Sequence, residues 1–517
     1  MEAGGPKVPK NQARGPFVLG PKTVSEAGQA SERWTLREIV RSPHAWVSTT
    51  YFAEGFPYSI VHSLSEAIFV ARGASLEALG VTSLFHLPWN LKFAWGPWLD
   101  RYGTKRAWLV GTEIALALAL VVAAFLAAPA FPLSYLAAIF LVVGFLGATQ
   151  DIAIDGFYLE ALDDEGQSKF VGYRAAAYRV SMLAVGGGLV AIGPKLGWAL
   201  TVGLSAAIMA VLTLYHRRGL PRVEREGEPF AKLGKALFGG RLLVVALLVS
   251  AAVYGLKDKL TIEMVVRWSA IGLLALLLTG LLALPVLKRR YRDSDAPHAL
   301  AFMSFLTQRR VWAILAFTLC FRLGESFLGK MKLAFLHREL GMPMEHFGAA
   351  NGTIGIVALF VATLVGGRMI AKDGLRKWIW PFVLSQNVLN LLYASAAWFD
   401  LRELWQQYLI IGVERFGEGL GTAVFMVYLM RTCAPEHKAA HYAIVSALMS
   451  VGFTFAGTVS GQIAESLGFA NYFVFSFVAT VPGMLLIFWL PHLDGRENAQ
   501  EGAASAASGD GESRSAP

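Results

Sequence analysis

The sequence predicts an all-α, multi-pass membrane protein with two six-helix bundles in parallel pseudo-repeat and two further helices inserted between them. Of the 517 residues, 55% are hydrophobic and only 16% are charged, and the mean hydropathy is +0.49. Soluble proteins carry about a quarter charged residues. The apolar residues form blocks of about 20, the length that crosses a bilayer as a helix. A glycine-containing loop pattern also recurs later in the chain, which indicates duplication.

Fourteen apolar segments are long enough to span a bilayer. They are predicted at 44–70, 76–99, 107–128, 133–160, 170–193, 197–215, 239–256, 264–287, 310–336, 345–370, 376–399, 404–431, 440–466 and 469–490. Residues 34–42 predict a short interfacial helix before the first span. The expected domains are a disordered cytoplasmic tail (1–33), an N-terminal bundle (34–215), a basic cytoplasmic linker with the two inserted helices (216–309), a C-terminal bundle (310–491) and a second disordered cytoplasmic tail (492–517).

Basic residues predict the orientation in the membrane. Lys and Arg are concentrated in alternate loops, above all 216–240 and 288–310, and loops of this kind remain in the cytoplasm. Both termini are then expected to be cytoplasmic. The net charge of +9 is explained by these loops and their attraction to anionic lipid, so no nucleic-acid partner is expected. Cys320 and Cys433 are too few for a disulfide framework, and no metal site is expected.

The repeated loop aligns the two halves of the chain. GPWLDRYGTKR begins at Gly96, and GRMIAKDGLRK begins at Gly367, 271 residues later. The same offset aligns Glu54 with Glu325 in the opening helix of each half. Two related helical bundles with a binding site at their interface are typical of secondary transporters.

The first copy of this loop predicts a latch. Gly96 and Gly103 permit close helix approach and a tight turn. Asp100 can accept hydrogen bonds from the N-terminus of a facing helix or pair with a basic residue. The other charged members of the pattern are Arg101, Lys105 and Arg106. The pattern resembles the signature loop of the major facilitator superfamily, and we expect it to hold one conformation and release another.

Longer stretches resemble AmpG-type muropeptide permeases. The stretch from SLEALG to TKRAW is similar to their second helix and loop, and EGFPYSI (54–60) is similar to their first-helix segment. ATQDIAIDGFYLEAL (148–162) is similar to their fourth-helix S/T-Q-D-I-x-x-D pattern, and AYRVSMLAVGGG (177–188) is similar to their fifth-helix pattern. The resemblance covers about residues 50–190, and acetyl-CoA transporters share its broad outline.

This resemblance implies an importer of anhydromuropeptides in the inner (plasma) membrane, coupled to protons and without another cofactor. The expected partner is a small anionic glycopeptide, and the protein is expected to be a monomer. The matched patterns also mark three positions for a signature or gating role, namely Gln150, Tyr178 and Arg179.

Asp151 and Asp155 stand out because they interrupt an apolar run. A charged side chain in the middle of a bilayer costs about 2.5–3.5 kcal/mol on insertion scales, so both should face the bundle interior and have partners. The candidates are Lys92, Arg174 and Arg179. We favour a salt-bridge network that gates the cytoplasmic side, because these groups lie nearer the inner end. A proton site or substrate contact remains the alternative.

Polar stripes predict the central cavity. In the helix 310–336 the polar residues share one face at 100° per residue and apolar residues lie opposite. The members of the three stripes with a proposed substrate or coupling role are Glu54, Tyr58, His62, Arg322, Glu325, Lys330, Lys332, Glu414, Arg415 and Glu418. The alternatives are internal ion pairing in the C-terminal bundle and, for His62, a hydrogen-bonded cavity histidine. Gln386, Asn387 and Asn390 are candidate sugar contacts or interhelical hydrogen bonds.

Together these features predict a proton symporter that works by alternating access. Glu325 is the first candidate for the coupling proton, and Arg322 is expected to hold an anionic group of the substrate. An enzyme is not expected, because no clustered nucleophile or His–Asp pair is present, and an ATP-driven pump is not expected, because glycine-rich phosphate-binding loops are absent. Two alternatives stay open: a transporter of another anionic or acylated solute, such as acetyl-CoA or a peptide, and a non-transporting membrane sensor on the same fold.

Overall fold

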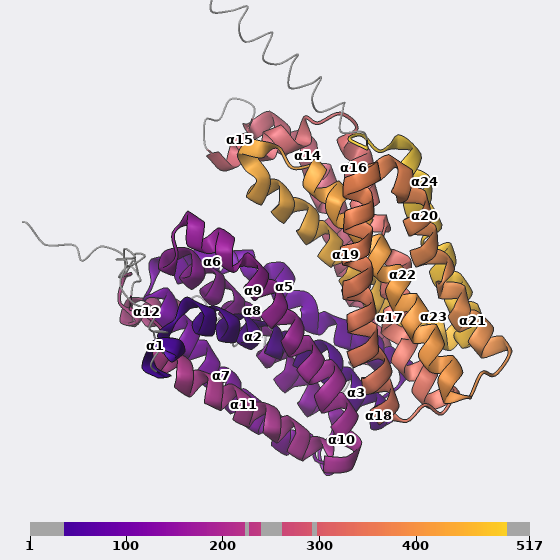
Figure 1. Cartoon of the computed structure of the whole chain (residues 1–517), viewed down its shortest axis with the longest axis horizontal. Helices are drawn as coiled ribbons and strands as arrows, with labels where there is room; N and C mark the ends of the chain where they lie inside the picture. The colour runs from indigo at the N-terminus through magenta and orange to yellow at the C-terminus, as the bar shows by residue number, and fades with distance from the viewer. Residues whose placement is uncertain (1–35, 223–226, 239–260, 292–296, 494–517) are drawn as a thin grey trace, which may run out of the picture.

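The computed structural model describes residues 36–222, 227–238, 261–291 and 297–493. Two helical bundles lean together at one end and spread apart at the other, with the N-terminal bundle in indigo to magenta and the C-terminal bundle in salmon to yellow (Figure 1). The predicted tail 1–33, the inserted span 239–256 and nearly all of the tail 492–517 lie outside the described residues.

The N-terminal bundle contains six predicted spans, several of which are built from more than one helix. Its helices are α1 (Leu36–Arg41), α2 (Pro43–Ser59), η1 (Ile60–Leu64), α3 (Ser65–Ala71), α4 (Leu76–Val81), η2 (Thr82–His86), α5 (Leu87–Leu91), η3 (Lys92–Ala94), α6 (Gly96–Arg101), α7 (Lys105–Leu126), α8 (Leu133–Ala161), α9 (Asp164–Met182), η4 (Leu183–Leu189), α10 (Val190–Leu196) and α11 (Trp198–Gly219).

The connecting region and the C-terminal bundle follow. Their helices are α12 (Phe230–Phe238), α14 (Ile262–Tyr291), α15 (Pro297–Leu306), α16 (Val311–Cys320), α17 (Leu323–Ala334), η5 (Phe335–Glu339), α18 (Met344–Phe347), η6 (Gly348–Ile354), α19 (Gly355–Asp373), α20 (Leu375–Val388), α21 (Asn390–Trp398), α22 (Leu404–Arg431), η7 (Pro435–His437), α23 (Lys438–Val478), α24 (Val481–Leu486) and η8 (Ile487–Trp489). Helix α14 packs against α4 of one bundle and α23 of the other.

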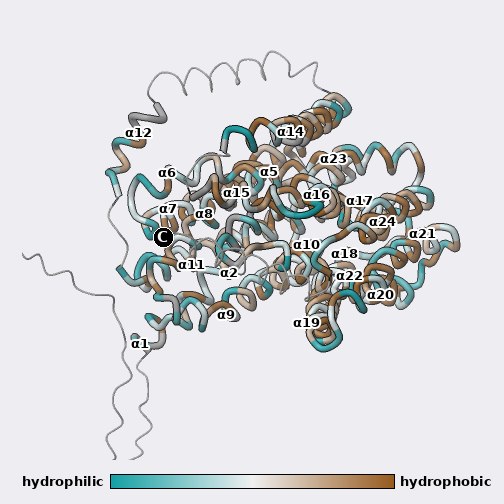
Figure 2. The backbone as a smooth tube through the Cα atoms, turned by 90° about the horizontal axis from the view of Figure 1, so that it is seen from above, coloured by the Kyte–Doolittle hydropathy of each residue, from teal (hydrophilic) through white to brown (hydrophobic). Residues whose placement is uncertain are grey.

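The spans have the composition of membrane helices. Within the described residues, seven helices are long and apolar enough to cross a bilayer by themselves. Hydrophobic residues occupy the spans, and hydrophilic residues gather at turns (Figure 2). The chain is therefore a multi-pass membrane protein, while the count of fourteen spans stays a prediction.

The internal repeat is visible in the backbone. All six glycines with a positive φ in the described residues form pairs: Gly73 with Gly341, Gly103 with Gly374, and Gly197 with Gly468. The last two pairs are 271 residues apart, the offset found in the loop pattern. Residues other than glycine rarely adopt a positive φ. Glycines at equivalent turns therefore indicate that the chain turns at the same places in the two bundles.

Several predicted continuous spans are interrupted in the structure, two of them in the C-terminal bundle beside residues of interest. The span 310–336 divides at Phe321 and Arg322, between α16 and α17, and the span 376–399 divides at Leu389. By contrast, the predicted boundary between the last two spans coincides with Gly468, whose φ of 71° breaks α23. The break at Arg322 matters for function because it places the start of α17 beside the space between the bundles.

The two bundles meet at one end through helices α4 with α23, α10 with α18, and η4 with η6. Glycines allow this contact. A Cβ on Gly352 would lie 2.0 Å from the Gly186 carbonyl oxygen, and a Cβ on Gly461 would lie 2.0 Å from the Leu76 carbonyl oxygen. The backbones of the two halves therefore touch at this closed end, while the signature loop after α6 lies at the opposite, open end (Figure 1).

Candidate functional site

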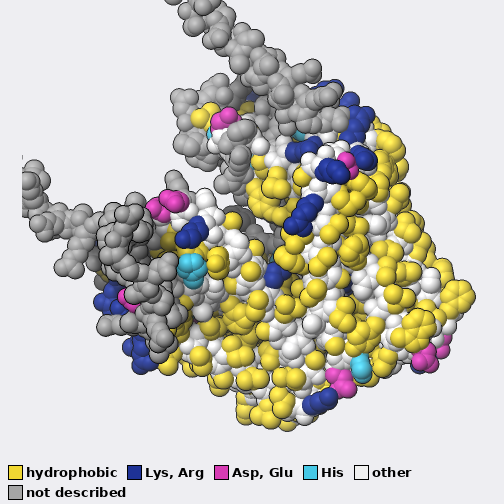
Figure 3. Space-filling model, in the orientation of Figure 1, with side chains coloured by type: hydrophobic (Ala, Val, Ile, Leu, Met, Phe, Trp, Pro, Cys, Tyr) yellow, Lys and Arg dark blue, Asp and Glu magenta, His cyan; other side chains and the backbone are white. Residues whose placement is uncertain are grey.

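A cavity of about 550 Å³ lies between the two bundles. In the space-filling view the bundles enclose a hollow, and Lys and Arg side chains lie along its wall (Figure 3). Nine of the ten residues predicted for the cavity line it: Tyr58, His62, Arg322, Glu325, Lys330, Lys332, Glu414, Arg415 and Glu418. The tenth, Glu54, is not among the lining residues.

Arg322 is held inside the C-terminal bundle. Its Nε donates to Glu325 Oε2 at 3.0 Å, and its second guanidinium nitrogen donates to the other oxygen of the same carboxylate. That nitrogen also lies 3.4 Å from Glu418. A bidentate pairing of arginine with a carboxylate is among the strongest side-chain interactions. Arg322 is therefore already bound to Glu325 before any substrate arrives.

The neighbouring charges are paired as well. Lys332 donates to Glu414 at 2.9 Å, and Arg415 donates to Glu418 at 2.5 Å. Arg415 also donates to Asn351 at 2.8 and 3.0 Å. In this C-terminal network three cations face three carboxylates, so the network is electrically balanced. This is the arrangement that the alternative of internal ion pairing requires.

The three amides proposed as sugar contacts lie behind the cavity wall. Gln386, Asn387 and Asn390 are all buried, and none lines the cavity. Gln386 instead donates to Glu325 at 3.0 Å. In this conformation the bond between Gln386 of α20 and Glu325 of α17 fits the alternative of interhelical hydrogen bonds, and Gln386 orients a carboxylate of the network.

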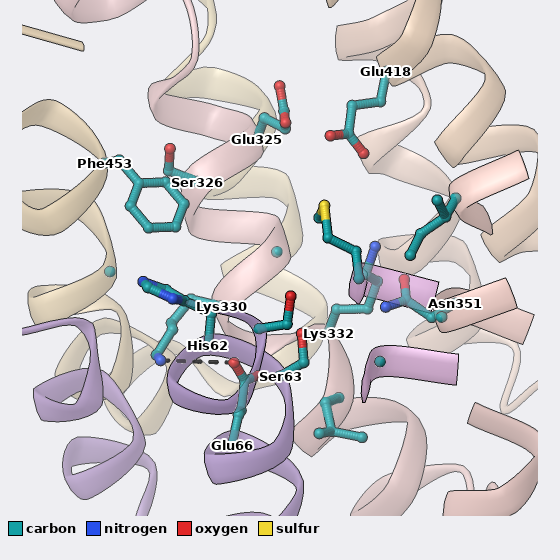
Figure 4. Close-up of a pocket in the computed structure, with 18 of the residues that line it drawn as sticks. His62, Ser63, Glu66, Glu325, Ser326, Lys330, Lys332, Asn351, Glu418 and Phe453 are labelled. Carbon is teal, nitrogen blue, oxygen red and sulfur yellow. Dashed lines mark ion pairs between the residues drawn. The ribbon is translucent and has the colours of Figure 1, made fainter. Parts of the chain in front are cut away.

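Lys330 connects the two bundles at the closed end of the cavity. It lies 3.7 Å from Glu66 of the N-terminal bundle, as the dashed line in Figure 4 shows, and donates to Thr82 at 2.6 Å. His86 contacts Ser450 at 2.8 Å, and it joins His62 at 2.9 Å. The contacts of Lys330 and the His86–Ser450 contact cross the boundary between the bundles, so they hold the two halves together on this side, while His62 supports His86 from within the N-terminal bundle.

A second group of charges lies within the N-terminal bundle. Lys92 pairs with Asp151, and Arg174 pairs with Asp155 at 2.7 Å. Glu54 lies close to Asp151 and Asp155 and completes this carboxylate cluster, and its Oε2 atom is buried without a partner in the described structure. Three carboxylates therefore share two cations, which leaves one negative charge uncompensated.

Gln150 belongs to a buried network that the sequence interpretation did not identify. It donates to Glu113 at 3.3 Å, and Glu113 bonds to His216 at 2.7 Å. Both Glu113 and His216 are fully buried. The network joins α7, α8 and α11, and His216 also contacts Thr49 of α2. It thus ties four helices of the bundle together.

The signature loop forms a pair within itself and a clip with the connecting segment. Asp100 pairs with Lys105, and Arg106 donates to the Arg217 carbonyl at 2.6 Å. The Gly103 amide donates to the Glu228 carbonyl at 2.7 Å, and the Glu228 amide donates to the Arg101 carbonyl at 2.8 Å. In this conformation Asp100 is paired with its own loop.

The Glu228 side chain strengthens this clip. It accepts from Arg101 at 3.1 Å and pairs with Lys232 at 3.2 Å. Hydrogen bonds from Lys232 and Arg101 lower the pKa of Glu228. The Phe230 ring covers Gly103, where a Cβ would meet it at 2.2 Å. The segment between the bundles is therefore fastened to the loop predicted to act as a latch.

The remaining gating positions occupy different places. Gly96 lies near Ile152, and the Tyr178 ring lies 6.1 Å from the ring of Tyr58. Arg179 lines the cavity and does not pair with the carboxylates Asp151 or Asp155. The group predicted as one gate is thus divided between the loop, the carboxylate cluster and the cavity.

Glu66, His86 and Asn351 line the cavity but were not among the predicted site residues. Glu66 could have been found, because it continues the stripe Tyr58 and His62 in steps of four along the first span. Asn351 carried no signal, since a single amide among glycines and alanines has no distinguishing pattern.

Comparison with known proteins supports the same fold and class. A model of the Major Facilitator Superfamily matches residues 314–512. The chain is 26% identical over 442 residues to the anhydromuropeptide permease of Escherichia coli (strain K12), covering 84% of this chain and 77% of the relative. It is 21% identical to putative transporter AmpG 4 of Rickettsia felis, covering 84% and 93% of the two chains.

Solved structures show the same architecture at low identity. A POT family transporter in complex with 5-aminolevulinic acid has a TM-score of 0.64 at 14% identity, with 86% of this chain and 95% of that chain covered. A bacterial homologue of the human lysosomal transporter Spinster, inward-facing and unoccupied, has a TM-score of 0.57 at 13% identity, with 88% and 96% covered. At such identities the likeness concerns the fold.

Proposed function

This chain is a major facilitator superfamily transporter, distantly related to the anhydromuropeptide permeases, and we propose that it imports anhydromuropeptides into the cytoplasm together with protons. It belongs to a class of permeases, not enzymes. One observation carries the substrate proposal. Five cations and four carboxylates line the cavity between the bundles, so the wall has an excess of positive charge that favours an anionic solute.

The cavity also has a suitable size and chemistry. Its volume of about 550 Å³ lies in the range of sites that enclose small molecules. Hydroxyl groups of Ser326 and Thr422 and the amide of Asn351 lie beside the charged groups. A muropeptide carries sugar hydroxyls and peptide carboxylates. The polar side chains of the wall can bind the hydroxyls, and its cations can bind the carboxylates.

We assign the coupling proton to the Glu54 cluster. There, three carboxylates share two cations, whereas the cavity network around Glu325 is balanced. A buried group of charges with one excess carboxylate is stabilised by a bound proton. Glu54 is the preferred carrier because its Oε2 atom is buried and unpaired. Glu325, the first candidate from the sequence, becomes the second.

The transport cycle follows from these assignments. The two ends of the cavity open in turn, one beside the signature loop and the other beside Lys330 and Glu66. The described conformation is closed at the Lys330–Glu66 side and open beside the signature loop. With the cytoplasmic orientation predicted from basic loops, this is the inward-open state, in which substrate leaves the cavity and the proton leaves Glu54. Reversal needs the bundles to separate at their glycine contacts.

Uptake by purified protein in liposomes tests this function. An anhydromuropeptide, the free sugars, acetyl-CoA and a dipeptide are offered with an inward proton gradient and again with a protonophore. We expect accumulation of the anhydromuropeptide alone, abolished by the protonophore. Uptake of acetyl-CoA or the dipeptide instead would replace the substrate proposal, and uptake of none of the solutes, with binding retained, would favour a sensor.

A further inference from the structure

The cations of the cavity differ in whether they are already paired. Glu325 and Glu418 engage Arg322, and Glu414 engages Lys332. The remaining pairs are Arg415 with Glu418 and Lys330 with Glu66. Arg179 is the exception: across the described part of the chain, no carboxylate lies within 4.0 Å of it.

Arg179 is positioned to meet a solute. It belongs to the last turn of α9, in the N-terminal bundle, and lines the cavity with Met182 and Gly186. Its guanidinium carbon lies 5.9 Å from the centre of the Phe360 ring, which belongs to α19 of the other bundle. A half-exposed contact of this kind is weaker than two hydrogen bonds to a carboxylate, so an incoming anion can displace it.

We propose that Arg179 is the residue that binds the carboxylate of the transported solute. This rests on the proposed function and adds the contact that selects for an anion. A planar guanidinium can donate two parallel hydrogen bonds to the two oxygens of a carboxylate. Arg322, which the sequence pointed to for this role, already donates in that way to Glu325. The excess positive charge of the cavity therefore resides on Arg179.

The proposed location has a consequence for the cycle. Arg179 lies on the N-terminal bundle, whereas the balanced network and Asn351 lie on the C-terminal bundle, as the close-up of that wall illustrates (Figure 4). A solute held by its carboxylate at Arg179 and by its hydroxyl groups at the facing wall would touch both bundles. Such bridging contacts are what allow a solute to favour the closed arrangement of the two halves.

The test compares solutes that differ only in charge. Uptake kinetics are measured for an anhydromuropeptide and for the same compound with its carboxylates converted to amides. The variants are Arg179→Gln, Arg179→Lys and the control Arg402→Gln, which alters an exposed arginine of the loop before α22. Each variant is first checked for a monodisperse profile in detergent.

We expect Arg179→Gln to raise KM for the acid about tenfold or more, as the loss of charge-assisted hydrogen bonds predicts, and to leave KM for the amide unchanged. Arg179→Lys should recover part of the preference, and Arg402→Gln should resemble the wild type. An unchanged acid-to-amide ratio in Arg179→Gln would overturn the assignment.

The result separates this inference from the proposed function. If the wild-type protein carries a different anionic solute, the muropeptide proposal fails, and the same comparison of acid and neutral forms of that solute decides the role of Arg179. If the wild type carries the muropeptide and Arg179→Gln keeps its charge preference, only the assignment of Arg179 fails.

Discussion

Lys330 of α17 and Glu66 of α3 join the two halves of the molecule across the closed end of the cavity. Their charged atoms lie 3.7 Å apart, and both side chains are largely buried. Lys330 also donates to Thr82 of the N-terminal bundle. An ion pair that exists only when the bundles are together stabilises the closed end relative to the open one.

Glu66→Gln should therefore populate a state that is open at this end. Loss of one charged contact of this kind is worth roughly 1 kcal/mol, or about fivefold in the equilibrium. Pulsed electron resonance between spin labels at Ser134 and Glu403, both exposed, should then show a new population at longer distance. Exchange of the two charges, Glu66→Lys with Lys330→Glu, should reverse it. An unchanged distance distribution would mean that the glycine contacts alone close this end.

Glu325→Gln should lower the thermal stability of the detergent-purified protein. Arg322 would lose the carboxylate that accepts from two of its nitrogens, and breaking a buried ion pair costs up to about 3–5 kcal/mol. The midpoint of thermal inactivation measures this, with the exposed Glu465→Gln as control. Adding Arg322→Gln to Glu325→Gln should recover part of the loss, because neither partner is then left charged and unpaired.

The cavity residues were predictable because of helical periodicity, whereas their pairing was not. One polar face of the predicted helix 310–336 placed Arg322, Glu325 and Lys330 on the same wall, and all three line the cavity in the structure. Which carboxylate each cation meets depends on neighbouring helices far away in sequence, as with Glu66. The break beside Arg322 carried no proline or other local signal.

The repeat was predictable for a similar reason. A duplicated sequence keeps its turns, so Gly103 and Gly374 share a left-handed conformation as well as a loop pattern. The connecting segment has no counterpart in either half, and its clip to the signature loop through Glu228 therefore could not be read from the repeat.

Glu54→Gln should uncouple transport. With the charge removed, the cluster holds two carboxylates, Asp151 and Asp155, for two cations, and no site for an extra proton remains. Liposomes should still exchange labelled for unlabelled solute but should not accumulate it against its gradient. Glu325→Gln, assayed in parallel, should retain accumulation in the fraction that is folded. The opposite pattern would return the coupling site to Glu325.

The clip between Glu228 and the signature loop should withstand moderate acidity. Lys232 and Arg101 lower the pKa of Glu228, so the carboxylate contributes stability at neutral pH and loses it only as the pH falls through that lowered value, below the ordinary value of about 4.3. The protection factor of the Gly103 amide in hydrogen exchange should stay constant from pH 8 to pH 5. Glu228→Gln should reduce this factor throughout the range, and equal protection in the variant would show that the backbone contacts suffice.

The orientation predicted from basic loops can be tested with single cysteines on exposed residues of opposite ends. Lys232 and Arg290 lie in the connecting region, and Arg402 lies in the loop before α22. After Cys320 and Cys433 are replaced by serine, Lys232→Cys and Arg290→Cys should resist a membrane-impermeant thiol reagent in intact cells and react once the membrane is opened. Arg402→Cys should react in both conditions, because its loop is expected outside. Labelling of Lys232→Cys in intact cells would reverse the orientation. The described conformation would then be open to the outside, and the direction of the proposed transport cycle would have to be inverted with it.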